Sequence, residues 1–335
     1  MTGGLAASPA TRPDVLHRRT GLRLGPLALG TAPLAGLFSP VGERAAYDAL
    51  RAAWDAGIRA YDTAPHYGAG LAEQRLGAFL RGLPEAERAH AVVSTKVGRL
   101  LVPAGDAPHG ARGAEFADED GGLVRIRDYS RSGVRRSIED SLRRTGLDQV
   151  AIALVHDPDD HLDQAVSETV PELVRMREEG LVRAVGAGMN DAAPLARLVR
   201  ETDVDCVLPA GRWSLLDRTA ARELLPLCAR REVAVLVGGV FNSGILADPR
   251  PGAMFDYQPA PEPVLSAALE MRRLCEEAGV EPAAAALQFP FRHPAVGTVV
   301  VGARSAEEVR QNAGHLTAHV PEQLWERLEA LAVFR

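Results

Sequence analysis

Four ionisable side chains each end, or closely follow, a short apolar run: Asp62, Tyr67, Lys96 and His156. The aspartate and the tyrosine lie in AYDTAPHYG, the lysine ends VVSTK and the histidine ends AIALVH. Taken singly, an aspartate or a histidine at such a place is commonly a capping or loop residue. Four such residues on three consecutive predicted strands are hard to explain as caps, so we interpret them as one site.

The acid strengths of these groups suggest what the site does. A free tyrosine has a pKa of about 10, too high for proton exchange at neutral pH. A nearby ammonium favours the phenolate, and a carboxylate can hold that ammonium in place. Moving the phenol pKa about 2–3 units towards neutrality takes roughly 3–4 kcal/mol, which is the order that one desolvated cation at ~4 Å supplies. Tyr67 is therefore predicted to be the general acid or base, poised by Lys96, which Asp62 orients.

His156 would donate a hydrogen bond to the substrate oxygen and set its orientation. Such a site moves protons but has no electron carrier of its own. A redox reaction between a carbonyl and an alcohol at this site therefore needs a nicotinamide cofactor.

The elements that must position these residues follow one rhythm. After residue 20, a β-branched run, a loop and an amphipathic segment repeat eight times. The predicted strands are 27–30, 58–63, 91–96, 150–156, 182–187, 204–209, 233–237 and 298–301, and the predicted helices are 43–56, 71–82, 132–145, 164–180, 191–202, 217–231, 263–279 and 305–313. Short, nearly continuous apolar strands are typical of a parallel sheet that is buried on both faces. Eight such units indicate an α/β fold, a single (β/α)₈ TIM barrel over 21–335, with the polar strand ends gathered on one rim.

Two long loops and both ends of the chain depart from this rhythm. Long loops, 97–131 after the third strand and 238–262 after the seventh, are expected to be lids or binding loops on the C-terminal side of the barrel. Residues 1–20 are predicted to form a flexible arm, and 16–24 could form a hairpin that closes the barrel floor. The tail 321–335 is predicted to be an additional amphipathic helix.

Composition excludes several classes of protein. The chain has 335 residues, 46% of them hydrophobic and 24% charged, as in an ordinary globular protein. A net charge of −6, from 38 basic and 44 acidic residues, disfavours a nucleic-acid partner, and no apolar window is long enough to span a membrane. Without a secretory signal or a CxxC pair, Cys206, Cys228 and Cys275 are expected to be reduced and mostly buried in a cytoplasmic protein.

Two other kinds of site are disfavoured. The segments GAGLAE (68–73) and GAGMND (186–191) begin like a Rossmann fingerprint but lack its third glycine. The acidic and histidine residues at 156–161 could bind a metal, but strand one ends in LGTAP and offers no further ligand, so we interpret the aspartates as helix caps and predict no metal.

The sequence resembles the aldo-keto reductase superfamily over roughly residues 22–315. The resemblance rests on GTAPLAG (30–36), GIRAYDTAPHYGAGLAEQRLG (57–77), STKVGR (94–99), LVHDPDD (154–160), AVGAGMN (184–190) and VVVGARSAEEVRQN (299–312). Within the superfamily it is most similar to the group of L-fucose and D-threo-aldose 1-dehydrogenases, through GLFSPV (36–41), AGRWSLLD (210–217), GGVFNSGIL (238–246) and RHPAV (292–296). This resemblance implies a (β/α)₈ barrel that binds NAD(P)(H), with Asp62, Tyr67, Lys96 and His156 as the family's catalytic tetrad.

The resemblance also implies where the cofactor and the substrate bind. The cofactor contacts would be Thr31, Asp62, Asn190, Phe241, Ser243, Gly302, Arg304, Glu308 and Asn312, and the substrate contacts would be Phe38, His156 and Trp213. NADP-preferring members have a lysine and an arginine where this chain has Gly302 and Glu308. A carboxylate repels a 2′-phosphate and accepts a bond from a 2′-hydroxyl, which favours NAD. Arg304 could instead bind a phosphate, which leaves NADP open.

The expected reaction is the oxidation of the anomeric hydroxyl of a free aldose to the lactone, with Tyr67 as general base. The aldose would be of the L-fucose, D-arabinose or L-galactose type. Charged residues of the loop after strand three could bind its hydroxyls or simply be solvated: Arg112, Glu115, Asp118, Asp120, Arg125 and Asp128. The alternatives are another small carbonyl or alcohol, such as a pyridoxal-type compound or an aldehyde, and a weakly catalytic cofactor-sensing subunit. We expect a monomer or homodimer whose partner is a small sugar.

Overall fold

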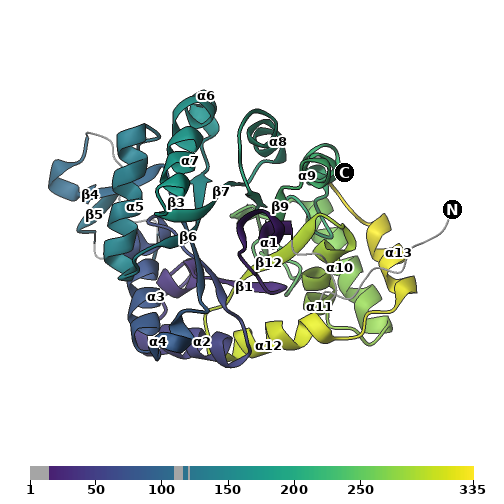
Figure 1. Ribbon diagram of the computed structural model, residues 1–335. Helices are drawn as coiled ribbons and strands as arrows, with labels where there is room; N and C mark the ends of the chain where they lie inside the picture. The colour runs from purple at the N-terminus through teal and green to yellow at the C-terminus, as the bar shows by residue number, and fades with distance from the viewer. Residues whose placement is uncertain (1–14, 109–115, 120) are drawn as a thin grey trace.

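The computed structural model describes residues 15–108, 116–119 and 121–335, and its centre is a closed barrel of eight parallel strands (Figure 1). Around the barrel the strands are β1 (Leu27–Gly30), β12 (Val296–Gly302), β9 (Ala234–Gly238), β8 (Cys206–Pro209), β7 (Val182–Met189), β6 (Val150–His156), β3 (Val92–Val97) and β2 (Ala60–Asp62). Their order follows the chain, as expected when each strand is followed by a crossover that packs outside the barrel. The predicted (β/α)₈ fold is confirmed.

Helices form the outer layer of the barrel. They are α2 (Glu43–Asp55), α3 (Leu71–Arg81), α4 (Glu85–Arg88), α5 (Arg131–Thr145), α6 (Leu162–Gln164), α7 (Val170–Glu178), α8 (Ala192–Glu201), α9 (Leu224–Arg231), α10 (Glu262–Glu277), α11 (Pro282–Gln288), α12 (Ala306–Thr317) and α13 (Glu322–Ala330). Short 3₁₀ turns lie at Ala32–Ala35, Tyr67–Gly70, Ala104–Asp106, Asp159–His161, Thr219–Ala221 and Phe289–Arg292. The first and last units meet where α2 and α12 lie side by side, which closes the ring (Figure 1).

The predicted elements match most of these bounds. The predicted helix 164–180 is divided, because a π-helical turn at Ala165–Thr169 joins α6 to α7. The tail contains a helix, α13, as predicted. Helix α5 begins after Ser130, whose side chain accepts a hydrogen bond from Gly133 N, and ends at the left-handed Gly146, as in a standard C-cap.

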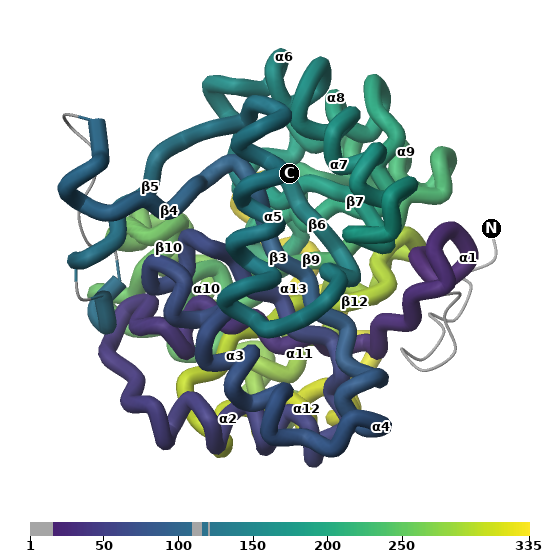
Figure 2. Tube along the Cα trace, turned by 60° about the vertical axis from the view of Figure 1, so that its left-hand side comes forward, coloured from purple at the N-terminus to yellow at the C-terminus, as the bar shows by residue number. Residues whose placement is uncertain are grey.

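The N-terminal prediction needs a correction. Residues 1–14 lie outside the described residues, and 15–20, predicted as part of a flexible arm and of a hairpin over 16–24, form helix α1 (Val15–Thr20) instead. Gly21, with φ +72°, ends this helix, so it acts as a helix stop rather than as a hairpin turn. Leu16 packs into the apolar cluster that fills the barrel interior. Figure 2 shows α1 on the side of the molecule opposite to β4 and β5.

The two long loops also contain more structure than the sequence predicted. The loop after β3 forms an antiparallel hairpin, β4 (Arg99–Pro103) with β5 (Leu123–Arg127), whose connection includes residues 109–115 and 120 outside the described part. The loop after β9 forms a shorter hairpin, β10 (Met254–Phe255) with β11 (Gln258–Pro259). Both residues of its turn, Asp256 and Tyr257, have positive φ, as a tight hairpin requires.

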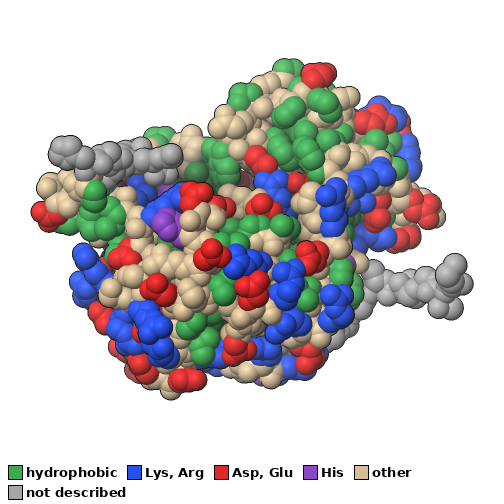
Figure 3. Space-filling view, turned by 90° about the horizontal axis from the view of Figure 1, so that it is seen from above, with side chains coloured by type: hydrophobic (Ala, Val, Ile, Leu, Met, Phe, Trp, Pro, Cys, Tyr) green, Lys and Arg blue, Asp and Glu red, His purple; other side chains and the backbone are tan. Residues whose placement is uncertain are grey.

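The surface and the thiols agree with the composition. Basic and acidic side chains are interspersed over the face seen from above, so neither sign dominates it (Figure 3). Cys206, Cys228 and Cys275 are all buried free thiols. None of the helices in the described part of the chain has the length and apolar character to cross a bilayer.

Candidate active site

The four predicted catalytic residues meet at the carboxyl ends of neighbouring strands. Asp62 is the last residue of β2, Lys96 lies next to the end of β3, and His156 is the last residue of β6. These strands are neighbours in the barrel, so their carboxyl ends lie on one rim. Tyr67 begins the 3₁₀ turn that follows β2.

Lys96 is the centre of the cluster. Its Nζ lies 2.6 Å from Asp62 Oδ2, 2.9 Å from the carbonyl oxygen of Thr63 and 2.9 Å from Tyr67 Oη. Its side chain is buried, with the whole residue 2% exposed, and the second carboxylate oxygen of Asp62 accepts a hydrogen bond from Ser94 Oγ at 2.7 Å. The three ammonium protons therefore have three acceptors.

Lys96 is also the only lysine in the chain, whose other 37 basic residues, histidines aside, are arginines. An ammonium is a compact charge that can meet three converging acceptors, whereas a guanidinium is a planar fork. The geometry therefore explains why a lysine stands at this position in a chain that otherwise uses arginine.

The acid strength of Tyr67 differs from the one that the sequence suggested. Burial raises the pKa of Tyr67 to about 12, and this effect outweighs the lowering by Lys96. The Lys96 ammonium does attract the phenolate, but the loss of solvation on burial is the larger effect, so the predicted lowering of the Tyr67 pKa is wrong for the protein alone. For Lys96, burial opposes the charged form, but Asp62 and Tyr67 outweigh it and raise the lysine pKa. The phenol is thus protonated beside a charged ammonium and carboxylate pair.

His156 is buried and uncharged. Burial, followed by the charges of Arg99 and Lys96, holds the pKa of His156 well below its usual value. Its Nδ1 has no hydrogen-bond partner among the described residues. The ring lies edge-on to Tyr67 with 5.9 Å between the ring centroids, so both groups can face one reacting atom.

The structure adds a second ion pair that the sequence analysis did not assign to the site. Arg99 Nη2 lies 2.8 Å from Asp157 Oδ2, and Arg99 Nη1 lies 3.3 Å from His66 Nε2. In the sequence, Arg99 and Asp157 are marked only by lying close to catalytic candidates. Asp157 follows His156, and Arg99 lies three residues after Lys96 in STKVGR. The aspartate had been interpreted as a helix cap.

The predicted substrate residues lie in different environments. Phe38 is 57% exposed and stacks on Tyr257, which is 51% exposed, with 5.9 Å between the ring centroids. The two rings join the loop after β1 to the β10–β11 turn. Trp213 is instead buried, packs on Phe289 and donates its Nε1 hydrogen to the carbonyl of Pro290 at 3.0 Å, which gives it a packing role.

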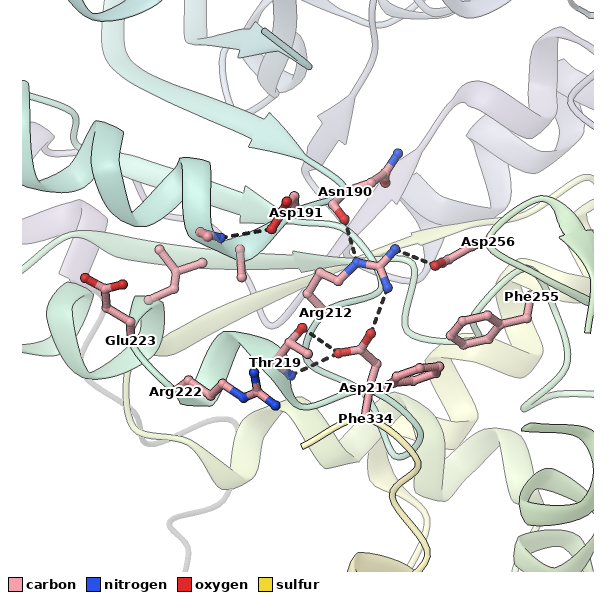
Figure 4. A pocket seen from close by; sticks show the side chains of 13 residues that line it. Asn190, Asp191, Arg212, Asp217, Thr219, Arg222, Glu223, Phe255, Asp256 and Phe334 are labelled. Atoms are coloured by element: carbon pink, nitrogen blue, oxygen red, sulfur yellow. Dashed lines mark hydrogen bonds and ion pairs between the residues drawn. The ribbon is translucent and has the colours of Figure 1, made fainter. Parts of the chain in front are cut away.

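Asn190 is held from its backbone. Figure 4 shows the Arg212 guanidinium between Asp217 and Asp256 in an open pocket beside Asn190. Arg212 donates to Asn190 O at 2.5 Å, to Asp217 Oδ2 at 2.7 Å and to Asp256 Oδ2 at 2.6 Å. One arginine therefore links the end of β7 to the turn of the β10–β11 hairpin.

The remaining predicted cofactor contacts lie on the same rim of the barrel, at the ends of other strands. Three adjacent strands, β1, β12 and β9, end in Gly30, Gly302 and Gly238, so no side chain rises from these ends. Phe241 and Ser243 follow β9, and the Ser243 hydroxyl accepts a bond from Tyr257 N at 3.1 Å. A flat, extended dinucleotide fits such a rim.

Thr31 and Glu308, two of the polar residues beside this rim, already have partners. The hydroxyl of Thr31 is buried and donates to the carbonyl of Asp62 at 3.0 Å. Glu308, in the first turn of α12, accepts from Arg304 N at 2.8 Å and from Arg304 Nη2 at 2.9 Å. Asn312, one turn further along α12, is buried.

The charged residues predicted to meet sugar hydroxyls are occupied where they are described. Arg125 pairs with Glu119 and donates to His66 O at 2.6 Å, and Asp118 lies 3.2 Å from Arg75 Nη1. Asp128 accepts from Ser130 at the start of α5. Arg112, Glu115 and Asp120 lie outside the described residues. Within the described ranges, no group of three histidine, cysteine or acidic side chains is arranged to hold a metal.

Comparison with known proteins places these features in context. A model of the Aldo/keto reductase family matches residues 26–333. A D-threo-aldose 1-dehydrogenase from a Pseudomonas species is 40% identical, covering 92% of this chain and 94% of its own, and a pyridoxal 4-dehydrogenase from Microbacterium luteolum is also 40% identical, covering 93% and 95%. The holo form of an aldo-keto reductase from Bacillus halodurans has the same fold, with a TM-score of 0.74 at 23% identity, covering 93% and 94%.

Proposed function

Because the chain belongs to the Aldo/keto reductase family and is an oxidoreductase, we propose that it oxidises the anomeric hydroxyl of a free aldose to the lactone. The aldose is of the L-fucose, D-arabinose or L-galactose type. The observation that carries the chemistry is the convergence of Asp62, Tyr67 and Thr63 on the buried ammonium of Lys96. The D-threo-aldose 1-dehydrogenase relative supports the substrate class.

Members of this family use NAD(P)(H), which when bound supplies the acceptor for the hydride. The chain's own residues manage the proton. In oxidation, Tyr67 accepts the proton of the anomeric hydroxyl, and the Lys96 ammonium 2.9 Å away stabilises the phenolate form that does so. In the reverse direction the protonated phenol, whose burial raises its pKa to about 12, donates.

His156 and Asp62 position the reacting groups. Because the pKa of His156 lies well below its usual value, the imidazole is neutral and orients the substrate oxygen by hydrogen bonding without adding a charge. Asp62 fixes Lys96 at 2.6 Å and is itself held by Ser94. Burial of this group excludes water and strengthens the interaction between the ammonium and the phenol.

NAD is the proposed cofactor. The Glu308 carboxylate turns back onto Arg304, both onto its backbone N–H and onto its guanidinium. This pair is electrically neutral and offers both an acceptor and a donor, which suits a 2′-hydroxyl. A 2′-phosphate would meet the carboxylate or have to displace it.

A second candidate substrate is a pyridoxal-type alcohol, because the pyridoxal 4-dehydrogenase relative is also 40% identical. Initial rates with a panel of free aldoses and with pyridoxine-type alcohols, each measured with NAD and with NADP, separate the two candidates. Turnover with the best aldose near the usual ~10 s⁻¹ is expected, and turnover many orders of magnitude lower with every compound would favour a cofactor sensor. Cytoplasmic location and a monomeric or homodimeric state stay predictions.

Replacement of Tyr67 tests the mechanism. Tyr67→Phe is expected to keep cofactor binding and to lower kcat at least ~100-fold, since only proton transfer is removed. Tyr61→Phe is the matched control. Tyr61 is also a buried tyrosine, one residue before Asp62, so the variant makes the same chemical change. Among the described residues, the Tyr61 hydroxyl donates to the carbonyl of Ile58. Equal rates for the two variants would remove Tyr67 from its role.

A further inference from the structure

A second ion pair lies beside the catalytic group and takes no part in the proton chemistry. It joins Arg99, the first residue of β4, to Asp157, the residue after β6. Nη2 and Oδ2 are 2.8 Å apart, and each side chain is 18% exposed, so the pair is partly open to solvent.

This pair adjoins His156, the residue proposed to orient the substrate oxygen. Asp157 Oδ2 lies 3.6 Å from His156 Nε2, a nitrogen of the imidazole that orients the substrate oxygen. Arg99 contacts the His66 ring, whose centroid is 5.6 Å from that of His156. A substrate held by His156 therefore extends towards this pair.

The backbone turns Asp157 towards Arg99 at an energetic cost. Asp157 has φ +42°, in the left-handed region that an aspartate adopts at some strain. Two contacts hold this conformation. Its backbone N–H donates to the carbonyl of Gly188 at 3.1 Å, and Tyr129 Oη lies 2.7 Å from its carbonyl oxygen. These two backbone contacts therefore fix the direction in which the Asp157 side chain points.

Both side chains keep unused hydrogen-bonding capacity. Arg99 Nε is buried and has no partner among the described residues. Among the described residues, Arg99 and His156 both contact Oδ2 of Asp157, which leaves Oδ1 available as an acceptor. A charged group with a spare donor beside a charged group with a spare acceptor matches two neighbouring hydroxyls.

We propose that Arg99 and Asp157 recognise a pair of adjacent hydroxyls on the substrate, one donating to the carboxylate and the other accepting from the guanidinium. This inference rests on the proposed function and narrows its substrate class to neutral compounds that carry a vicinal diol next to the reacting carbon. The pair has no net charge. The anion of a phosphorylated or carboxylated sugar would have to compete with Asp157 for the Arg99 guanidinium, and a flat heteroaromatic alcohol offers no diol.

The test combines a change in the protein with a change in the substrate. The kcat/KM of the best aldose is compared with that of its analogue lacking one hydroxyl next to C1, in the unaltered enzyme and in Asp157→Asn and Arg99→Met. A hydrogen bond to a charged group is worth a factor of about 10–100, so the deoxy analogue is expected to be poorer by that factor in the unaltered enzyme. In the variant that lacks the charged partner of the missing hydroxyl, the penalty is expected to shrink to less than about 3-fold, because that partner is gone.

A matched control is the ion pair between Arg127 and Asp160, which joins the same hairpin to the same loop but is exposed, with 3.3 Å between the charged atoms. Asp160→Asn is expected to leave the deoxy penalty unchanged. If Asp157→Asn and Arg99→Met each lower kcat/KM equally for both sugars, the pair is structural and the inference is overturned while the proposed function stands. If the unaltered enzyme oxidises no aldose, the proposed function fails and the diol inference fails with it.

Discussion

Replacing Lys96 by methionine tests whether the buried ammonium and carboxylate form one unit. The variant leaves the Asp62 carboxylate buried, and among the described residues the Ser94 hydroxyl is the one side-chain donor that it keeps. Removing one partner of a buried ion pair costs about 3–5 kcal/mol, because the other charge is left uncompensated. That is a large part of the roughly 5–15 kcal/mol by which a folded protein is stable, so the loss is measurable by urea unfolding.

The double variant Asp62→Asn/Lys96→Met provides the decisive comparison. It removes both charges, so at least about 2 kcal/mol of the lost unfolding free energy is expected to return. Activity is not expected to return, since Tyr67 then has no ammonium to stabilise its phenolate, and kcat falls by about 10²–10⁴-fold in both variants. A double variant that is less stable than Lys96→Met, or a single variant within about 1 kcal/mol of the unaltered protein, would refute the coupling.

Arg19→Met is the control at the opposite side of the molecule. Arg19 Nε lies 3.1 Å from the buried Asp205, but Arg177 Nη1 lies 2.7 Å from the same carboxylate. Because Asp205 keeps one guanidinium, this variant is expected to lose no more than about 1 kcal/mol and to keep full activity. Comparison with Arg19→Met therefore distinguishes the effect of losing an ion pair in general from the effect of losing the pair between Lys96 and Asp62.

Three further outcomes follow from the acid strengths and the cofactor rim. Aldose oxidation is expected to rise by up to about 10-fold per pH unit between pH 7 and 9, because the raised pKa of Tyr67 leaves the phenolate scarce at neutrality; a flat profile would exclude it as the base. Glu308→Arg is expected to raise the ratio of kcat/KM with NADP to that with NAD by at least ~10-fold, and an unchanged ratio would place the 2′ position elsewhere. Below pH ~6.5 the unfolded chain protonates His156 and the folded one does not. Unfolding free energy should therefore fall by about 1.4 kcal/mol per unit as pH decreases, less steeply in His156→Asn; equal slopes would contradict a neutral buried ring.

The barrel and the meeting of the candidate catalytic residues could be predicted from the sequence for a simple reason. Each apolar run of the barrel is short, and on three adjacent strands an ionisable residue ends the run, so the fold alone brings Asp62, Lys96 and His156 to one rim. The contacts among these residues depend on little more than the order of the strands around the barrel. The prediction therefore needed only the period of the hydrophobic pattern.

What the sequence could not predict depends on long-range placement and on solvation. Arg99 and Asp157 are 58 positions apart, and they meet because β3 pairs with β6 in a register that sets Val97 opposite Val155, two positions before each of them. The raised pKa of Tyr67 follows from burial by neighbours that no local pattern specifies. Helix α1 was missed because Leu16 and Leu22 also fit the alternation of a strand.

Because the chain has a single lysine, cleavage at that residue can measure how often the barrel opens. A protease specific for lysine has one target bond in the entire chain, the bond after Lys96. This bond lies within β3, one of the strands of the closed barrel. Cleavage requires that strand to leave its neighbours, so digestion yields two fragments, 1–96 and 97–335, only from molecules that have opened. The rate at which these fragments appear would be measured with and without dinucleotide or sugar. A lower rate in the presence of a compound would show how much its binding stabilises the closed barrel, with no label attached to the protein.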